Sequence, residues 1–110
     1  MNLLYIHIYD KLRKTNMKNL IISSKIEEKL NIKHQVRRVE VEECFLNRTG
    51  NVLIDIREDH CSDPPTTWFI AETHQGRLLK VIFIRKNKKI YLRTAYEPNN
   101  SEINIYNKHS

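Results

Sequence analysis

The chain has 110 residues, with 19 Lys and Arg against 13 Asp and Glu, so its net charge is +6 and its isoelectric point is near 9.4. This length predicts one domain with a modest core, and a charged fraction of 29% is ordinary for a soluble protein. The basic balance favours a polyanionic partner, with RNA first among them, and two cysteines exclude a four-cysteine zinc site.

Residues 1–16 are expected to be an N-terminal extension of uncertain order, followed by a single domain at residues 17–110. The apolar run 1–9 is too short to span a bilayer, and the lysines follow it instead of preceding it, unlike a signal peptide. We therefore expect a cytoplasmic protein without a membrane partner. In that compartment Cys44 and Cys61 are predicted to stay free thiols.

Two helices are predicted after a short strand at residues 19–22. The first helix covers residues 25–30 and is capped by Ser23 or Ser24, with Glu27 at capping-box spacing from Ser24. Residues 33–35 form a connector, and the apolar spacing of residues 36–46 predicts an amphipathic second helix.

Strands dominate the remaining chain, because its apolar runs are β-branched or aromatic and are separated by turn residues. They are expected at residues 52–56, 66–72, 78–84 and 90–96. A hairpin turn at residues 86–89 joins the last two, and Ser101 caps a closing helix at residues 102–106. The layout predicts an α+β fold with N-terminal helices, an antiparallel meander of about four strands and a C-terminal helix.

The stretch 77–96 carries positive charge only. Its basic residues are Arg77, Lys80, Arg85, Lys86, Lys88, Lys89 and Arg93. A cationic sheet of this kind indicates binding of a phosphate backbone. The lysines at the hairpin tip are the least specific part of the pattern, since tips are often lysine-rich to discourage edge pairing.

Several short motifs occur in an order that resembles the BrnT-type toxins. They are Lys33-His34, Asp55-x-Arg57, Gly76-Arg77-Leu78-Leu79-x-Val81, Ile90-x-Leu92-x-Thr94-Ala95, and Glu102 with Tyr106 on the closing helix. The resemblance covers residues 20–106. It implies a RelE-like fold and a ribonuclease toxin of a type II toxin–antitoxin pair, neutralised by an antitoxin encoded beside it. It also implies that DNA is reached only through the antitoxin.

The chain departs from the pattern of this family at two positions. Gln35 stands where the family usually has glycine after Lys-His. Tyr96 stands where the last strand usually ends in arginine. Arg93 lies three residues earlier, and alternation predicts that it shares a strand face with Ala95 while Tyr96 takes the other face.

A ribonuclease without metal or cofactor needs a base near the 2′-hydroxyl, positive charge on the phosphate and a proton for the leaving oxygen. We assign catalysis to His34, Arg57 and Arg93. The alternatives are a histidine that caps the helix end or packs beside Trp68, a surface ion pair of Asp55 with Arg57, and an Arg93 that pairs with Glu72 or Asp55. His60 is a further candidate.

RNA binding is assigned to Lys33, Arg77, Lys80, Arg85 and Tyr96. Tyr96 could also donate a proton or stack on a base, although a half-buried packing role is the commoner one for a strand tyrosine. We predict no metal: the loop 58–63 contains a histidine, a cysteine and carboxylates, but polar loops of this composition are common.

Two other functions are compatible with the same residues. The chain could be a catalytically silent module that binds RNA or a protein and has lost its chemistry with the arginine missing at Tyr96. It could also be a domain of unrelated function that shares only the meander.

Overall fold

The computed structural model describes residues 17–56 and 63–110, so the predictions for residues 1–16, Arg57, His60 and Cys61 lie outside the described residues. In chain order the elements are β1 (Leu20–Ile21), α2 (Ser24–Lys29), the π-helix η1 (Leu30–His34), α3 (Arg38–Asn47), β2 (Leu53–Ile54), β3 (Thr66–Glu72), β4 (Leu78–Lys86), β5 (Lys89–Tyr96) and α4 (Asn100–His109). The α+β class is confirmed.

One mixed sheet of five strands organises the molecule, in the order β1-β5-β4-β3-β2. The last four strands form the predicted antiparallel meander. The sheet differs from the predicted antiparallel sheet of about four strands in one respect: the short N-terminal strand β1 joins it as a fifth strand, parallel to β5. Its pairing joins Leu20 to Ile90 across most of the chain, which local periodicity cannot reveal.

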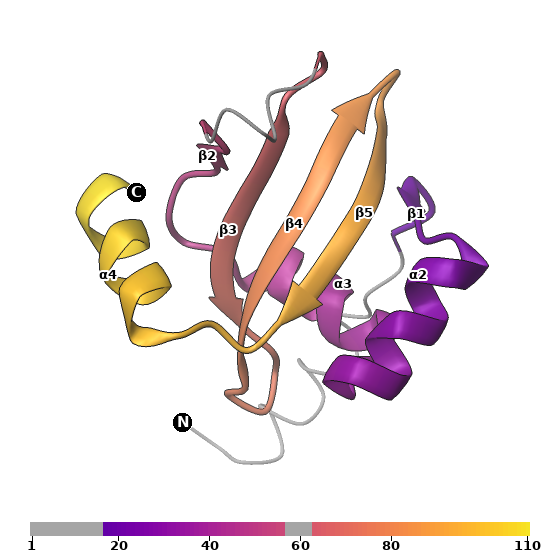
Figure 1. Cartoon of the computed structure of the whole chain (residues 1–110), viewed down its shortest axis with the longest axis horizontal. Helices are drawn as coiled ribbons and strands as arrows, with labels where there is room; N and C mark the ends of the chain where they lie inside the picture. Colours follow the sequence, from indigo (N-terminus) through magenta and orange to yellow (C-terminus); the bar gives the residue numbers. More distant parts are fainter. Residues whose placement is uncertain (1–16, 57–62) are drawn as a thin grey trace, which may run out of the picture.

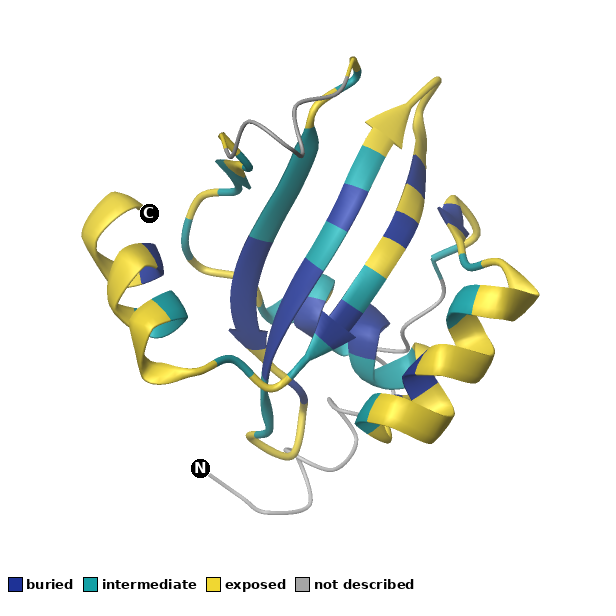
Figure 2. Ribbon diagram, viewed as in Figure 1, coloured by how far each residue is buried: buried dark blue, intermediate teal, exposed yellow. Residues whose placement is uncertain are grey.

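The helices lie on both faces of the sheet (Figure 1). Helix α3 packs behind β3 and β4, and its Val41 and Cys44 are fully buried against Phe69, Leu79 and Val81. Figure 2 shows the buried residues gathered on α3 and on the strand segments that cover it. The opposite face, here called the front face, carries Trp68, Lys80, Ile82, Thr94 and Tyr96.

The first helix begins at one of its two predicted caps and extends further than predicted. Its N-cap is Ser23, whose hydroxyl accepts a hydrogen bond from the backbone N–H of Ile26. Residues 33 and 34 of the expected connector are helical instead, because α2 continues into η1. The helix ends at Gln35, which adopts a left-handed backbone with φ 50° and ψ 45°. Glycine favours this conformation most, and Gln35 occupies the place where the BrnT pattern has glycine.

The β4–β5 hairpin has the expected turn and an unexpected bulge. Asn87 and Lys88 both have positive φ between the paired Lys86 and Lys89, as a two-residue type I′ turn requires. The register then shifts, since Leu92 pairs with Phe83 and Thr94 pairs with Ile82. The prediction that Arg93 and Ala95 share a face was therefore wrong: Arg93 is the extra residue of the bulge, and Ala95 shares the buried face with Leu92, three residues before it.

Helix α4 packs on the front face beside β3. Its N-cap is Asn99 and not Ser101: the Asn99 side chain accepts from the backbone N–H of Glu102, and Glu102 accepts from the backbone N–H of Asn99. Tyr106 anchors the helix, with its ring centroid 5.7 Å from that of Trp68 and its hydroxyl donating to the carbonyl of Asn51 at 2.9 Å.

Within residues 17–56 and 63–110, no helix is long and apolar enough to cross a membrane.

Candidate active site

Two side chains from neighbouring strands meet on one carboxylate of the front face. Lys80 on β4 is paired directly with Tyr96 on β5, so both side chains leave the sheet at the same level. The Lys80 ammonium and the Tyr96 hydroxyl each donate a hydrogen bond to Oε2 of Glu102 on α4, both at 2.7 Å. With His34, these residues are called the front-face cluster below.

The Glu102 carboxylate is held by donors on both oxygens. Its Oε1 accepts from the backbone N–H of Asn99 at the helix N-terminus, while Oε2 takes the Lys80 and Tyr96 donors. Burial alone would raise the pKa of Glu102. The hydrogen bonds from Lys80 and from the Asn99 backbone, joined by that of Tyr96, outweigh burial and lower this pKa below its ordinary value. Glu102 is therefore an anion at neutral pH.

Lys80 is a largely buried cation, with only 10% of its side chain exposed. Its charge is balanced by Glu102, and its ammonium lies over the Trp68 ring at 4.3 Å from the centroid. It also lies 5.9 Å from the centroid of the Tyr96 ring. An ammonium fixed between aromatic faces and a carboxylate acts as a localised positive charge of low mobility.

His34 lies at the last position of η1, half-buried beside Tyr96. The two ring centroids are 5.6 Å apart and the rings are tilted by 34°. Burial lowers the pKa of His34 below its ordinary value, and the ammonium groups of Lys33 and Lys29 lower it further. The imidazole is thus mainly neutral at pH 7 and able to accept a proton. Its contact is with Tyr96 and not with Trp68, the packing partner that we had considered.

The Arg77 guanidinium is hydrogen-bonded within the protein, although the sequence suggested that it binds RNA. Its guanidinium donates to the carbonyls of His34 and Gln35 at 3.0 and 2.8 Å. It also forms ion pairs with the carboxylates of Glu40 and Glu97, at 3.1 and 3.3 Å. Because its side chain is only 25% exposed, little of the guanidinium faces solvent.

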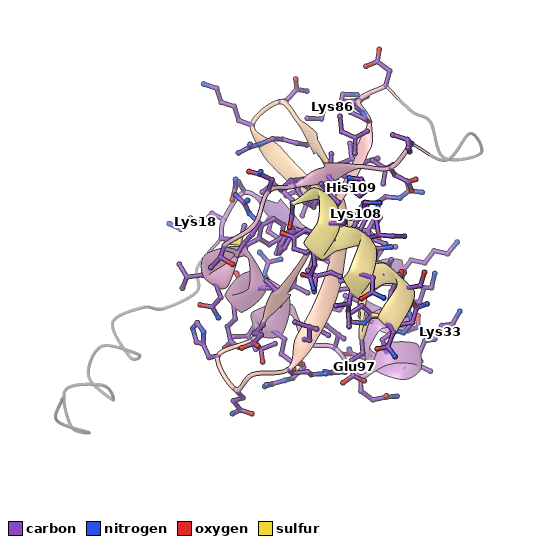
Figure 3. The ribbon with its side chains drawn as sticks, turned by 90° about the vertical axis from the view of Figure 1, so that its left-hand side faces the viewer. Lys18, Lys33, Lys86, Glu97, Lys108 and His109 are labelled. Atoms are coloured by element: carbon purple, nitrogen blue, oxygen red, sulfur yellow. The ribbon has the colours of Figure 1, made fainter. Side chains whose placement is uncertain are left out.

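The other assigned cations among the described residues are exposed and lie at different heights along the sheet. Arg93 is at the bulge of β5, and its side chain forms no ion pair with Glu72, Asp55 or any other described residue. Arg85 precedes the hairpin tip, whereas Lys33 extends from η1. In Figure 3, Lys33 lies at one end of the molecule, near Glu97, and Lys86 lies at the other.

Glu102 and Trp68 are the site residues that sequence reasoning had not assigned a role. The spacing Asn99-x-x-Glu102 is a capping box, which places Glu102 in the first turn of a helix but does not reveal what its second oxygen binds. Trp68 and Phe69 are neighbours on β3 and face opposite sides of the sheet: Phe69 is fully buried and Trp68 contacts Lys80 on the front face. Only the strand pairing reveals that Trp68, Lys80 and Glu102 converge.

Comparisons with known proteins give no match: no family model, no curated protein and no solved structure is found to be similar to this chain.

Proposed function

We propose that this chain is the toxin of a type II toxin–antitoxin pair, with a RelE-like fold, and that it cleaves RNA without a metal. The observation that carries the proposal is the front-face cluster: a neutral His34 ring stands against Tyr96, whose hydroxyl and the Lys80 ammonium meet on Glu102. Attack by a 2′-hydroxyl requires a proton acceptor, a proton donor and a positive charge close together. The imidazole, the hydroxyl and the ammonium of the front-face cluster are groups of these three kinds.

In the proposed reaction, His34 takes the proton of the 2′-hydroxyl as its oxygen bonds to phosphorus. The bond from phosphorus to the 5′-oxygen breaks, and the Tyr96 hydroxyl gives its proton to that oxygen. The products are a 2′,3′-cyclic phosphate and a 5′-hydroxyl end. Lys80 stabilises the negative charge on the phosphate and on Tyr96 as its proton leaves, because its ammonium is held 5.9 Å from the Tyr96 ring.

The exposed cations extend the site beyond a single phosphate. Lys33 is next to His34 in the chain, Arg93 comes three residues before Tyr96, and Arg85 lies toward the hairpin tip. From Lys80 to the end of β4 the strand rises by about 20 Å, at roughly 3.3 Å per residue. A ligand that reaches both ends is a polymer of phosphates, as single-stranded RNA is. Arg57 remains a candidate for the same surface. The antitoxin, which the BrnT resemblance implies, would cover this face.

A second function is favoured by the way the charges pair. Lys80 is neutralised by Glu102, Arg77 is neutralised by Glu40 and Glu97, and Tyr96 replaces the family's arginine. A site whose buried cations are already paired can bind RNA or a protein through the exposed cations around it without cleaving RNA.

Controlled expression in a bacterial host distinguishes the two functions. The toxin predicts growth arrest with fragmented RNA, relieved by His34→Ala but not by His109→Ala, which changes an exposed histidine at the far end of α4 (Figure 3). Normal growth with intact RNA, despite abundant folded protein, would contradict the toxin and support the binding module.

A further inference from the structure

The end of η1 is held by one side chain from the loop before β4. Nη2 of Arg77 donates to the carbonyl of His34 at 3.0 Å, and Nη1 donates to the carbonyl of Gln35 at 2.8 Å. These are the last carbonyl of the π-helix and the carbonyl of its left-handed cap. Carbonyls at the end of a helix lack intrahelical donors and carry partial negative charge, so a guanidinium fits them well.

The guanidinium itself is fixed from two further sides. Nη1 also donates to both carboxylate oxygens of Glu40 on α3, at 3.3 and 3.1 Å, while Nε donates to Glu97, after β5, at 3.3 Å. The backbone N–H of Arg77 donates to the hydroxyl of Thr73. Burial opposes the charged form, but the hydrogen bonds from Arg77 to Glu40 and Glu97 raise the pKa of Arg77, so it stays a cation. Arg77 thus ties η1 to α3 and to the end of β5.

The end of β5 is Tyr96, the ring that His34 contacts. Glu97 follows it directly, so the two ends of the Arg77 network are the residue next to Tyr96 and the backbone of His34. The distance between the imidazole and the Tyr96 ring therefore depends on this network.

Resting on the proposed ribonuclease function, we propose that Arg77 is a positioning residue that sets the imidazole of His34 against Tyr96 through the backbone of η1, and that it does not bind the RNA phosphate. Lysine cannot replace it, because a single ammonium cannot reach two carbonyls and two carboxylates with the planar geometry of a guanidinium. Arg93 and Lys33 have a different role in this account: their exposed side chains bind the RNA phosphates directly.

Arg77→Lys keeps the positive charge but removes the planar, branched guanidinium. For RNA cleavage we expect kcat to fall by about 10²-fold while KM and the salt dependence of RNA binding stay unchanged, because a displaced base costs rate and not affinity. Weaker binding with a smaller salt slope and an unchanged kcat would overturn the proposal, since that is the result for a phosphate contact.

Arg38→Lys is the matched control. Arg38 also donates to two backbone carbonyls, those of Met17 and Leu20, and pairs with a carboxylate, that of Glu42. It holds the segment around β1 and, among the described residues, forms no hydrogen bond or ion pair with the end of η1. Its substitution is expected to lower the free energy of unfolding without changing kcat.

A second readout does not need activity. The pKa of the His34 imidazole, followed by NMR, should rise toward its ordinary value in Arg77→Lys, because a loosened η1 end exposes the ring to water. Glu97→Gln is a milder change at a carboxylate that is 67% exposed, and it should shift the pKa of His34 in the same direction. This variant provides the test if Arg77→Lys does not fold. An unchanged His34 titration in the folded variants overturns the positioning role. A changed titration in a protein that never cleaves RNA supports it and refutes the ribonuclease.

Discussion

Arg93 is the exposed cation closest in sequence to Tyr96, and the bulge of β5 sets it apart from the buried face. Arg93→Ala should weaken the binding of single-stranded RNA and reduce the salt slope by about 0.7, the value for one phosphate contact on a single strand. Titrations at several salt concentrations measure both quantities. Lys108→Ala, the same loss of charge on the exposed end of α4, should reduce them less (Figure 3). Equal slopes for Arg93→Ala and the native chain would remove Arg93 from the binding surface.

The sequence showed where the positive side chains are but not which of them are already paired. Residues 77–96 contain no acid, so Arg77 and Lys80 were assigned to RNA binding. In the structure Glu102 reaches Lys80, and Glu40 and Glu97 reach Arg77. Two of these carboxylates follow β5 and one comes from α3. Such pairings depend on tertiary contacts, which the spacing of residues along one strand does not record.

Gly50 and Tyr106 connect the loop before β2 to α4. A β-carbon at Gly50 would lie 2.6 Å from the Tyr106 hydroxyl oxygen and 3.0 Å from the Ser110 Oγ. The absence of a side chain at position 50 therefore lets the hydroxyl reach the carbonyl of Asn51. This contact fixes the helix that carries Glu102.

Gly50→Ala is expected to destabilise the protein by about 1–3 kcal/mol, the usual cost of overpacking. In a Tyr106→Phe background the cost should be smaller, because the hydroxyl that meets the new methyl is gone. Urea unfolding of the two single variants and the double variant gives the coupling. Additive losses would show that the methyl group and the hydroxyl do not compete for this space.

Elements with a strong local pattern were predicted closely, and those set by contacts were not. Strand β3 matches its predicted range, and β4 and β5 differ only at the hairpin end. The end of the π-helix η1 was predicted as a connector, because its hydrogen-bond pattern leaves no distinct periodicity in five residues. The arginine that holds its end is more than forty residues away. His34 was therefore identified from the sequence, while its support was not.

Acid should destabilise the whole molecule. The pKa values of Glu40 and Glu102 lie below 4.5 in the folded state, so both carboxylates stabilise the fold above that pH. As the pH falls through the lowered values, the unfolded chain binds more protons and this stabilisation is lost. The urea midpoint should drop between about pH 5 and pH 3. Glu102→Gln should lower the midpoint at pH 7 and flatten the drop, whereas a native midpoint that stays constant over this range would contradict the role of both carboxylates.

Cleavage of RNA by the purified chain, in the presence of EDTA, tests the central claim most directly. The native chain and His109→Ala should cut single-stranded RNA at neutral pH and leave 2′,3′-cyclic phosphate and 5′-hydroxyl ends. His34→Ala, purified in the same way and equally folded, should be slower by about 10²–10⁴-fold, the usual contribution of a general base. Intact RNA with the folded native chain, or cleavage by His34→Ala at the native rate, would contradict a ribonuclease centred on His34.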